Sequence, residues 1–438
     1  MAQLETYMLS GSIKVVERFF DLPLNYYEPL GSTIRVFVRH LIPTDMAKTP
    51  DDEAKLPYIL FLQGASDTSV VTFGYQLLER GPGVEVDLQS HFNIAAATLW
   101  MDSRGTGLST PFTADLVGGK SDQEIFEYLK NFRADSIVRD CERIREAILG
   151  HFEDPEKRKW TILGQSFGGF VALTYLSFYP EGLKEVFLTA GLAPLVDHPD
   201  PVYHTLEAKV YERNVLYYQK YPGDVKRVRD ILRHLDSNQV VLPNGGYLSP
   251  TRFLQLGLEF GMHGGIDRVH QLVFRAANDL QLFGKLSYGF LQNLQALQRL
   301  DSNPFYAILH EVIYCQGRAA NWAGRRVLAQ YKEHQWSLMK KEAESKAVYF
   351  VGELIFPENL DDCANLRPLK EAAHLLGPRP TLSYVDDMYV EFGRAQATAA
   401  SVANVRQFIS NRYLHNGIRK GPASIIKELL VISKREYD

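Results

Sequence analysis

The serine best placed to act as a nucleophile is Ser166, at the centre of the run GQSFG at 164–168. The run follows an apolar segment typical of a strand, 159–163, and precedes a segment typical of a helix. A serine at such a turn takes a strained backbone conformation, and the flanking glycines keep the turn from clashing with neighbouring strands. Peptide N–H groups at the start of the helix can stabilise an oxyanion. The sequence therefore predicts a catalytic serine, with an ordinary structural turn as the alternative.

A serine hydroxyl needs a base and an orienting acid, and both must come from later in the chain. His415 is the best placed histidine, because it closes a strand-like run at 406–414 and precedes the last predicted helix. Asp386 and Asp387 end the strand candidate LSYV, and either could orient the imidazole. The order serine, aspartate, histidine is one that a catalytic triad takes. The alternatives are a surface-loop histidine and aspartates that only end a strand.

The hydrophobic pattern indicates which elements position these residues. The first 45 residues alternate between apolar and polar, as half-exposed antiparallel strands do. Short apolar runs at 57–62, 93–100, 159–163 and 185–191 are typical of parallel strands covered on both faces. A long helix is expected over about 122–149, where apolar residues recur every three to four positions. The pattern predicts an α/β protein, with a mostly parallel sheet and helices on both faces.

The strand-helix alternation is interrupted by a long segment that is rich in Tyr, Leu, Arg and His and helical in several pieces. It resumes with LSYVDDMY, the run at 406–414 and a final helix at 424–434. We therefore expect a core in two parts, residues 1–194 and 379–438, with an inserted helical cap at 195–378 over the active face.

Composition excludes several classes of function. The chain has 48 Lys and Arg against 52 Asp and Glu, a net charge of −4, and no basic run, which argues against nucleic acid as a partner. Neither a signal pattern nor a membrane-spanning apolar window is present, so we expect a soluble, cytoplasmic protein without a membrane partner. The three cysteines lack CxxC spacing, which makes a disulfide framework or zinc site improbable. The sequence does not indicate an oligomeric state.

Several motifs together resemble the proline iminopeptidases, and more narrowly their longer, fungal-type members. The resemblance runs from about Tyr58 to the C-terminus, and its motifs are GQSFGG, FRADSIVRDCERIR at 132–145, DSRGTGLS at 102–109, DDMYV and HNGIR. It implies the α/β-hydrolase fold with a helical cap. It also implies release of an N-terminal proline through a serine acyl-enzyme, with no metal or other cofactor.

Matched motif by motif, the resemblance makes Ser166 the nucleophile and His415 the base. The family's acid turn matches the residues from Asp387 onward, which favours Asp387 over Asp386. The oxyanion donors would be the backbone N–H of Phe167 and one N–H from the loop after 57–62.

That loop would offer Gly64 or Ala65 as the second oxyanion donor. The substrate would be a peptide or small amide with a free N-terminal amine, and a buried carboxylate in the cap would pair with that cation. Family-like motifs offer Glu311, in HEVIYCQG, and Glu353, in YFVGELIFP. The alternatives are that Glu311 is an ordinary residue on a helix surface and that Glu353 is an ordinary residue at the end of a strand.

The chain also departs from the family pattern. The run Gly64-Ala65-Ser66-Asp67 replaces the usual Gly-Gly-Pro-Gly, and Ser103 replaces a glutamine. A negative charge from Asp67 near the oxyanion would oppose catalysis. Two other interpretations therefore stay open. The chain could hydrolyse another amide or ester, for instance in a fungal biosynthetic route, or it could be a catalytically weak binding protein of the same fold.

Overall fold

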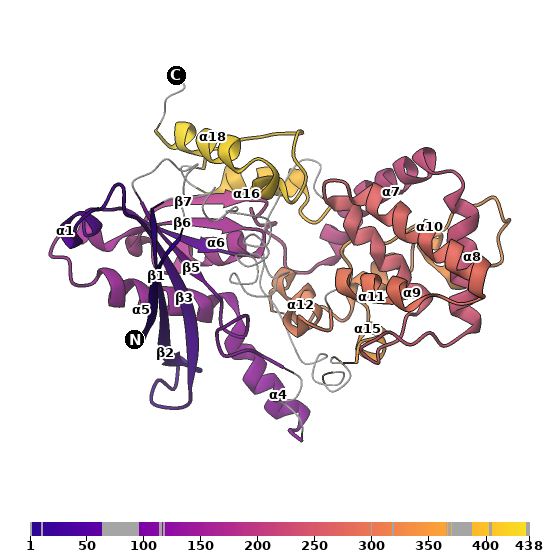
Figure 1. The fold of residues 1–438 in the computed structure, drawn as a ribbon, viewed down its shortest axis with the longest axis horizontal. Helices are drawn as coiled ribbons and strands as arrows, with labels where there is room; N and C mark the ends of the chain where they lie inside the picture. Colours follow the sequence, from indigo (N-terminus) through magenta and orange to yellow (C-terminus); the bar gives the residue numbers. More distant parts are fainter. Residues whose placement is uncertain are drawn as a thin grey trace.

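The computed structural model describes residues 2–9, 12–63, 96–113, 116, 119–298, 300–317, 319–364, 366, 369, 388–402 and 405–434. Within this part of the chain, one seven-stranded sheet has the order β1-β2-β3-β5-β4-β6-β7 (Figure 1). The strands are β1 (Ala2–Leu9), β2 (Ile13–Pro23), β3 (Thr33–Pro43), β4 (Tyr58–Leu62), β5 (Ala97–Met101), β6 (Trp160–Gln165) and β7 (Leu183–Thr189).

The sheet is antiparallel at one end and parallel at the other. β1, β2 and β3 pair antiparallel, as the alternating pattern predicts, and β3 pairs antiparallel with β5. β5, β4, β6 and β7 pair in parallel. The four short apolar runs are therefore the parallel strands that the sequence predicts, and β5 and β6 are buried along their whole length.

Helices cover both faces of this sheet, which is why its central strands carry apolar side chains on both sides. On one face pack α5 (Ala134–Leu149) and α6 (Phe167–Phe178), through residues such as Ile137, Ile144 and Tyr175. On the other face pack α17 (Gly417–Lys420) and α18 (Pro422–Lys434), through Ile418 and Ile425.

The helix predicted over 122–149 is divided in two. α4 (Asp122–Leu129) begins at a capping box formed by Ser121 and Glu124, and a short 3₁₀ turn follows it at Lys130–Phe132. The extended conformation of Arg133, with φ −90° and ψ 170°, then separates this turn from α5. The Phe132 side chain is buried at this break.

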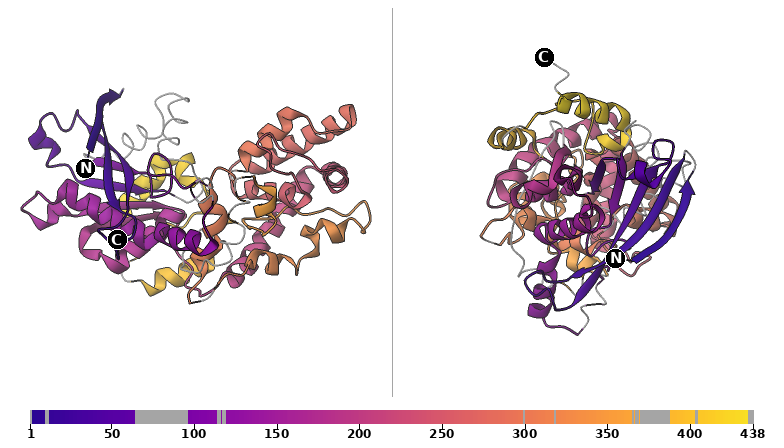
Figure 2. Two further views of the ribbon diagram at one scale, coloured as in Figure 1. Left: turned by 90° about the horizontal axis from the view of Figure 1, so that it is seen from below. Right: turned by 90° about the vertical axis from the view of Figure 1, so that its left-hand side faces the viewer.

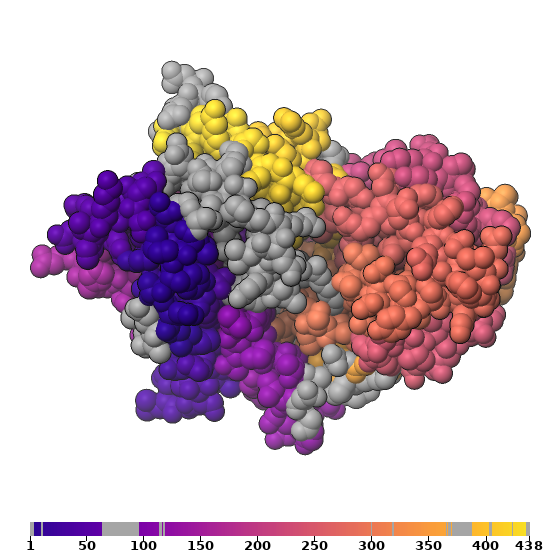
Figure 3. All heavy atoms as spheres, viewed as in Figure 1, coloured from indigo at the N-terminus to yellow at the C-terminus, as the bar shows by residue number. Residues whose placement is uncertain are grey.

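A helical region lies beside the sheet, at the right of Figures 1 and 3, and the left panel of Figure 2 shows the same separation from below. Its helices are α7 (Asp200–Lys220), α8 (Asp224–Ser237), α9 (Pro250–Leu254), α10 (Gly265–Phe283), α11 (Tyr288–Leu297), α12 (Pro304–Leu309), α13 (Ala323–Leu328), α14 (Trp336–Met339) and α15 (Asn359–Asp362). Most of them share one core, which includes Val228, Phe253 and Phe350. Among the described residues, no helix is both long and apolar enough to cross a membrane.

The chain returns to the sheet through α16 (Phe392–Ser401) and the final helices. A short helix, α1 (Pro50–Glu53), lies at the left of Figure 1, at the end of the molecule away from the helical region. The strand predicted at 406–414 is wrong, because the described residues there form no strand. A strand needs a hydrogen-bonded neighbour, and no described residue pairs with this mostly exposed segment in a sheet. The strand candidate at 382–385 lies outside the described residues.

Candidate active site

Ser166 occupies the sharp turn between β6 and α6. Its backbone has φ 53° and ψ −121°, a conformation that residues with a side chain rarely adopt. The turn is held by the Ser166 N–H, which donates to the Thr189 carbonyl at 3.0 Å. A Cβ on Gly168 would lie only 1.8 Å from the Leu62 carbonyl oxygen, so only glycine fits there. The strained, glycine-dependent turn predicted around this serine is therefore present.

The imidazole of His415 lies against this serine. Its Nε2 is 3.1 Å from the Ser166 Oγ, although 249 residues separate the two in the chain. His415 is buried, in the loop just before α17. The distance is suitable for a hydroxyl that donates to Nε2, as general-base activation of a serine requires.

Three of the other predicted site residues, Asp387, Gly64 and Ala65, lie outside the described residues, as does Asp386. Phe167 is described, and it is the first residue of α6. An N–H at the first position of a helix has no partner within the helix, and the helix dipole adds positive potential there. The Phe167 N–H is therefore suited to donate a hydrogen bond to an oxyanion next to Ser166.

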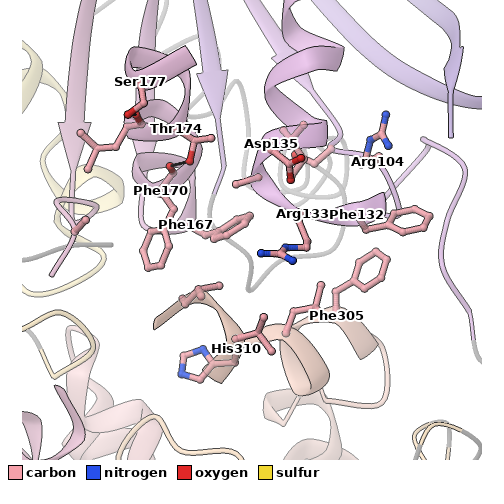
Figure 4. A pocket seen from close by; sticks show the side chains of 18 of the residues that line it. Arg104, Phe132, Arg133, Asp135, Phe167, Phe170, Thr174, Ser177, Phe305 and His310 are labelled. Carbon is pink, nitrogen blue, oxygen red and sulfur yellow. Dashed lines mark hydrogen bonds between the residues drawn. The ribbon is translucent and has the colours of Figure 1, made fainter. Parts of the chain in front are cut away.

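A cavity of about 670 Å³ begins beside Phe167 and runs between α5, α6 and α12 (Figure 4). Its volume is in the range of pockets that hold small organic ligands. Figure 4 shows the phenyl rings of Phe167 and Phe305 on opposite sides of the Arg133 guanidinium. Sequence reasoning missed Arg133 and Phe305 as candidate site residues. The only signal was Arg133's place in the motif at 132–145, which carried the resemblance but no assigned role.

Glu353 lies next to this cavity. Tyr306, which lines the cavity, donates its hydroxyl to the Glu353 Oε1 at 2.8 Å. Burial, together with the Glu353 carboxylate, raises the pKa of Tyr306 well above its usual value, so the phenol stays a neutral donor. Glu353 itself is half-buried. An ionised carboxylate can accept further hydrogen bonds beyond the one from Tyr306.

Glu311 is more deeply buried and has a different set of partners. Its carboxylate accepts the backbone N–H groups of Ala323, at 3.0 Å, and Gly324, at 2.7 Å. Burial raises its pKa to about 7, although the two backbone bonds oppose the shift. The bonds hold the start of α13, where Asn321 and Trp322 have φ of 50° and 56°. Glu311 therefore stabilises a strained turn at the start of α13, a contribution that the sequence did not indicate.

One buried ion pair supports the floor of the cavity. The Arg104 Nε donates to the Asp140 Oδ2 at 2.7 Å, and both side chains are fully buried. The same guanidinium donates to the Asn131 carbonyl at 2.7 Å. The neighbouring Gly105 has φ 82°, and a Cβ there would lie 1.9 Å from the Phe305 ring. Glycine therefore allows a phenyl ring of α12 to rest directly on this loop.

Comparisons with known proteins agree with this architecture. A family model described as "alpha/beta hydrolase fold" matches residues 59–231. The chain is 36% identical over 448 residues to a proline iminopeptidase of Aeromonas sobria, and the match covers 98% of each chain. It is 33% identical over 450 residues to "Proline iminopeptidase aneH" of Aspergillus aculeatus, covering 98% of this chain and 95% of that one. A solved structure from Mycobacterium tuberculosis, 13% identical, covers 94% of this chain and 97% of its own at a TM-score of 0.39, too low to support an argument.

Proposed function

The chain belongs to the proline iminopeptidase family of α/β hydrolases, and from this premise we propose that it releases N-terminal proline from peptides with Ser166, His415 and Asp387 as its triad. The observation that carries the proposal is the 3.1 Å contact between the Ser166 Oγ and the His415 Nε2. The strained turn at Ser166 supports it, because such turns expose a nucleophile at the edge of a sheet.

The reaction would proceed in two steps. The Ser166 Oγ attacks the prolyl carbonyl carbon while its proton moves to the His415 Nε2, and Asp387 stabilises the imidazolium. The oxyanion accepts hydrogen bonds from the N–H of Phe167 and of Gly64 or Ala65. The C–N bond then breaks, and the leaving amine takes the proton from Nε2. Water attacks the resulting ester and gives a proton to Nε2, which returns it to Oγ as proline leaves.

Selection of a free N-terminus needs a carboxylate that meets the prolyl ammonium. We propose Glu353 as the main partner, because one of its oxygens holds Tyr306 at the wall of the cavity. Glu311, whose pKa is raised to about 7, would add only part of a second negative charge at neutral pH, while its two oxygens remain bound to α13. An N-acylated proline has no ammonium and would leave the half-buried Glu353 charge without its cation.

We also propose that residues 195–378 act as a cap and that the cavity holds apolar parts of the substrate. Five phenylalanines line the cavity: Phe132, Phe167, Phe170, Phe178 and Phe305. Aromatic walls favour apolar groups that stack or pack edge-on. Phe167, the residue after the nucleophile, lines the cavity, so we expect a group bound in it to lie near the reacting carbonyl.

Turnover of a prolyl arylamide tests the proposal. We expect release of the arylamine by the wild-type protein, loss of at least about 10³-fold in kcat for Ser166→Ala, and no turnover of the N-acetylprolyl analogue. A serine-reactive phosphonate should label the wild-type protein but not Ser166→Ala. Equal turnover of the free and N-acetylated substrates would contradict the aminopeptidase assignment, and full activity of Ser166→Ala would contradict the nucleophile.

A further inference from the structure

One segment of the proposed cap contacts two residues that lie close in sequence to the proposed acid and to the proposed base. We call this segment, Leu258–His263, the cap platform; it consists of the last four residues of a 3₁₀ helix at Gln255–Gly261 and the two residues that follow, just before α10. It contacts Tyr389, two residues after the proposed acid, and Asn416, the residue after His415.

The first contact supports the ring of Tyr389. Its hydroxyl donates to the Leu258 carbonyl. A Cβ on Gly261 would lie 2.2 Å from the same ring, so the ring packs directly on the platform backbone. The same ring also contacts His415: the ring centres of Tyr389 and His415 lie 4.4 Å apart. The platform therefore reaches the imidazole through one aromatic side chain.

The second contact holds the residue next to the imidazole. The Asn416 Oδ1 accepts the backbone N–H of His263, at 3.3 Å, and lies 2.5 Å from the His263 Nδ1. A backbone N–H can only donate, which fixes the amide oxygen as the atom that faces it. The Nδ1 of His263 therefore carries a hydrogen and donates as well. Two bonds from one cap residue converge on one oxygen beside His415.

We infer that His263 is a positioning residue for His415, acting through Asn416, and that Tyr389 supports the same imidazole from its other side. The inference rests on the proposed catalytic role of His415. Proton transfer between Oγ and Nε2 depends strongly on their distance and angle, and a misplacement of about 1 Å can cost about 10²-fold in rate. A base anchored to the cap keeps its place relative to a substrate that the cap binds.

The test compares His263→Ala, Asn416→Ala and Tyr389→Phe with the wild-type protein. We expect each to lower kcat for a prolyl arylamide by about 10-fold and to change KM less than about twofold, since the loss falls on proton transfer. Labelling by a small fluorophosphonate should slow by the same factor, because it needs an activated Ser166 but no free amine. His263→Asn should recover most of the rate, because an amide nitrogen can replace Nδ1 as donor.

The matched control is His204→Ala. His204 is an exposed cap histidine whose Nδ1 lies 3.1 Å from the Tyr331 hydroxyl, and it should leave both rates unchanged. Thermal unfolding of every variant shows whether the fold is kept. Slower turnover with normal labelling would place His263 in substrate binding and overturn the inference, as would wild-type rates in both assays. If the wild-type protein is labelled but releases no proline, the proposed function fails, and the labelling rates still decide this inference.

Discussion

At the scale of single residues, the two cap glutamates have different surroundings and therefore different expected effects. Glu353→Gln keeps an acceptor for the Tyr306 hydroxyl but removes the negative charge beside the cavity. We expect kcat/KM for a prolyl arylamide to fall about 10- to 100-fold, because an ion pair with the substrate ammonium is lost. Turnover of an uncharged ester should change less than about twofold.

Steady-state kinetics on both substrates with this variant provides the measurement. Losses of equal size on the amine and the ester would show that Glu353 supports the structure of the site without selecting the amine.

Glu311 gives the protein a pH-dependent stability. Its folded pKa of about 7 lies above the ordinary 4.5, so the folded state holds a proton that the unfolded state has released between these values. The stability that this proton contributes is fully present below about pH 4.5 and is lost as the pH rises through about 7. We expect Glu311→Gln, which cannot titrate, to remove on the order of 2 kcal/mol of this pH dependence.

Urea unfolding of both proteins at pH 5 and pH 8 measures the effect. The free energy of unfolding of the wild-type protein, relative to that of Glu311→Gln, should be larger at pH 5. An unchanged difference at the two pH values would mean that the carboxyl is already ionised at pH 5.

At the scale of elements, α5 is joined to the loop under the cavity by the Arg104–Asp140 pair. Asp140→Asn removes the charge that neutralises a fully buried guanidinium and weakens the bond from the Tyr26 hydroxyl, which is 2.7 Å long. We expect a loss of about 3–5 kcal/mol in the free energy of unfolding, measured in urea.

Asp135→Asn is the matched control. Asp135 is on the same helix and pairs with Arg139 at 3.4 Å, but both side chains are partly exposed. Its loss should cost less than about 1 kcal/mol. Similar losses for the two variants would show that burial does not determine how much these ion pairs contribute to the free energy of unfolding.

Strands could be predicted from the sequence where both faces of the sheet are buried, because burial on both faces gives a continuous run of apolar residues. β5 and β6 are apolar because helices cover both faces of the sheet, so their runs could be recognised without a partner. The strand-like run at 406–414 gave the wrong answer, because residue types favourable to a strand do not show whether a neighbouring strand is present to pair with it. The break at Arg133 was also missed, because the apolar spacing on either side continues across it.

At the scale of the whole molecule, the convergence of Ser166 and His415 could be predicted, because a turn motif and chain order restrict where each must lie. The link between His263 and Asn416 could not, since 153 positions separate them, His263 belongs to no motif, and the motif HNGIR indicates no partner for Asn416. The role of Glu311 at the start of α13 was hidden for a similar reason. Its partners are backbone N–H groups, which every residue type except proline provides.

A group of aromatic rings forms one contact between the helical region and the part of the chain that carries the sheet. Phe305 stacks on Phe112 with ring centres 4.8 Å apart and lies 5.0 Å from Phe132. We expect Phe305→Ala to lower the free energy of unfolding by about 2–4 kcal/mol in urea, because it leaves a cavity between the two parts. Phe283→Ala is the control, since that ring is 61% exposed and should cost less than about 0.5 kcal/mol. Equal effects would mean that the ring of Phe305 contributes little to the joint.

The packing of the Phe305 ring over Gly105 also affects how a substrate could enter the cavity and how a product could leave it. Lifting the helical part away from the sheet would expose this phenyl group to water, at a cost of about 1.5–3 kcal/mol for one side chain alone. An open state of that kind would be populated only rarely. We therefore expect a di- or tripeptide to reach the cavity more readily than a folded polypeptide. Selection by substrate length would then take place at entry to the cavity, before any bond is broken.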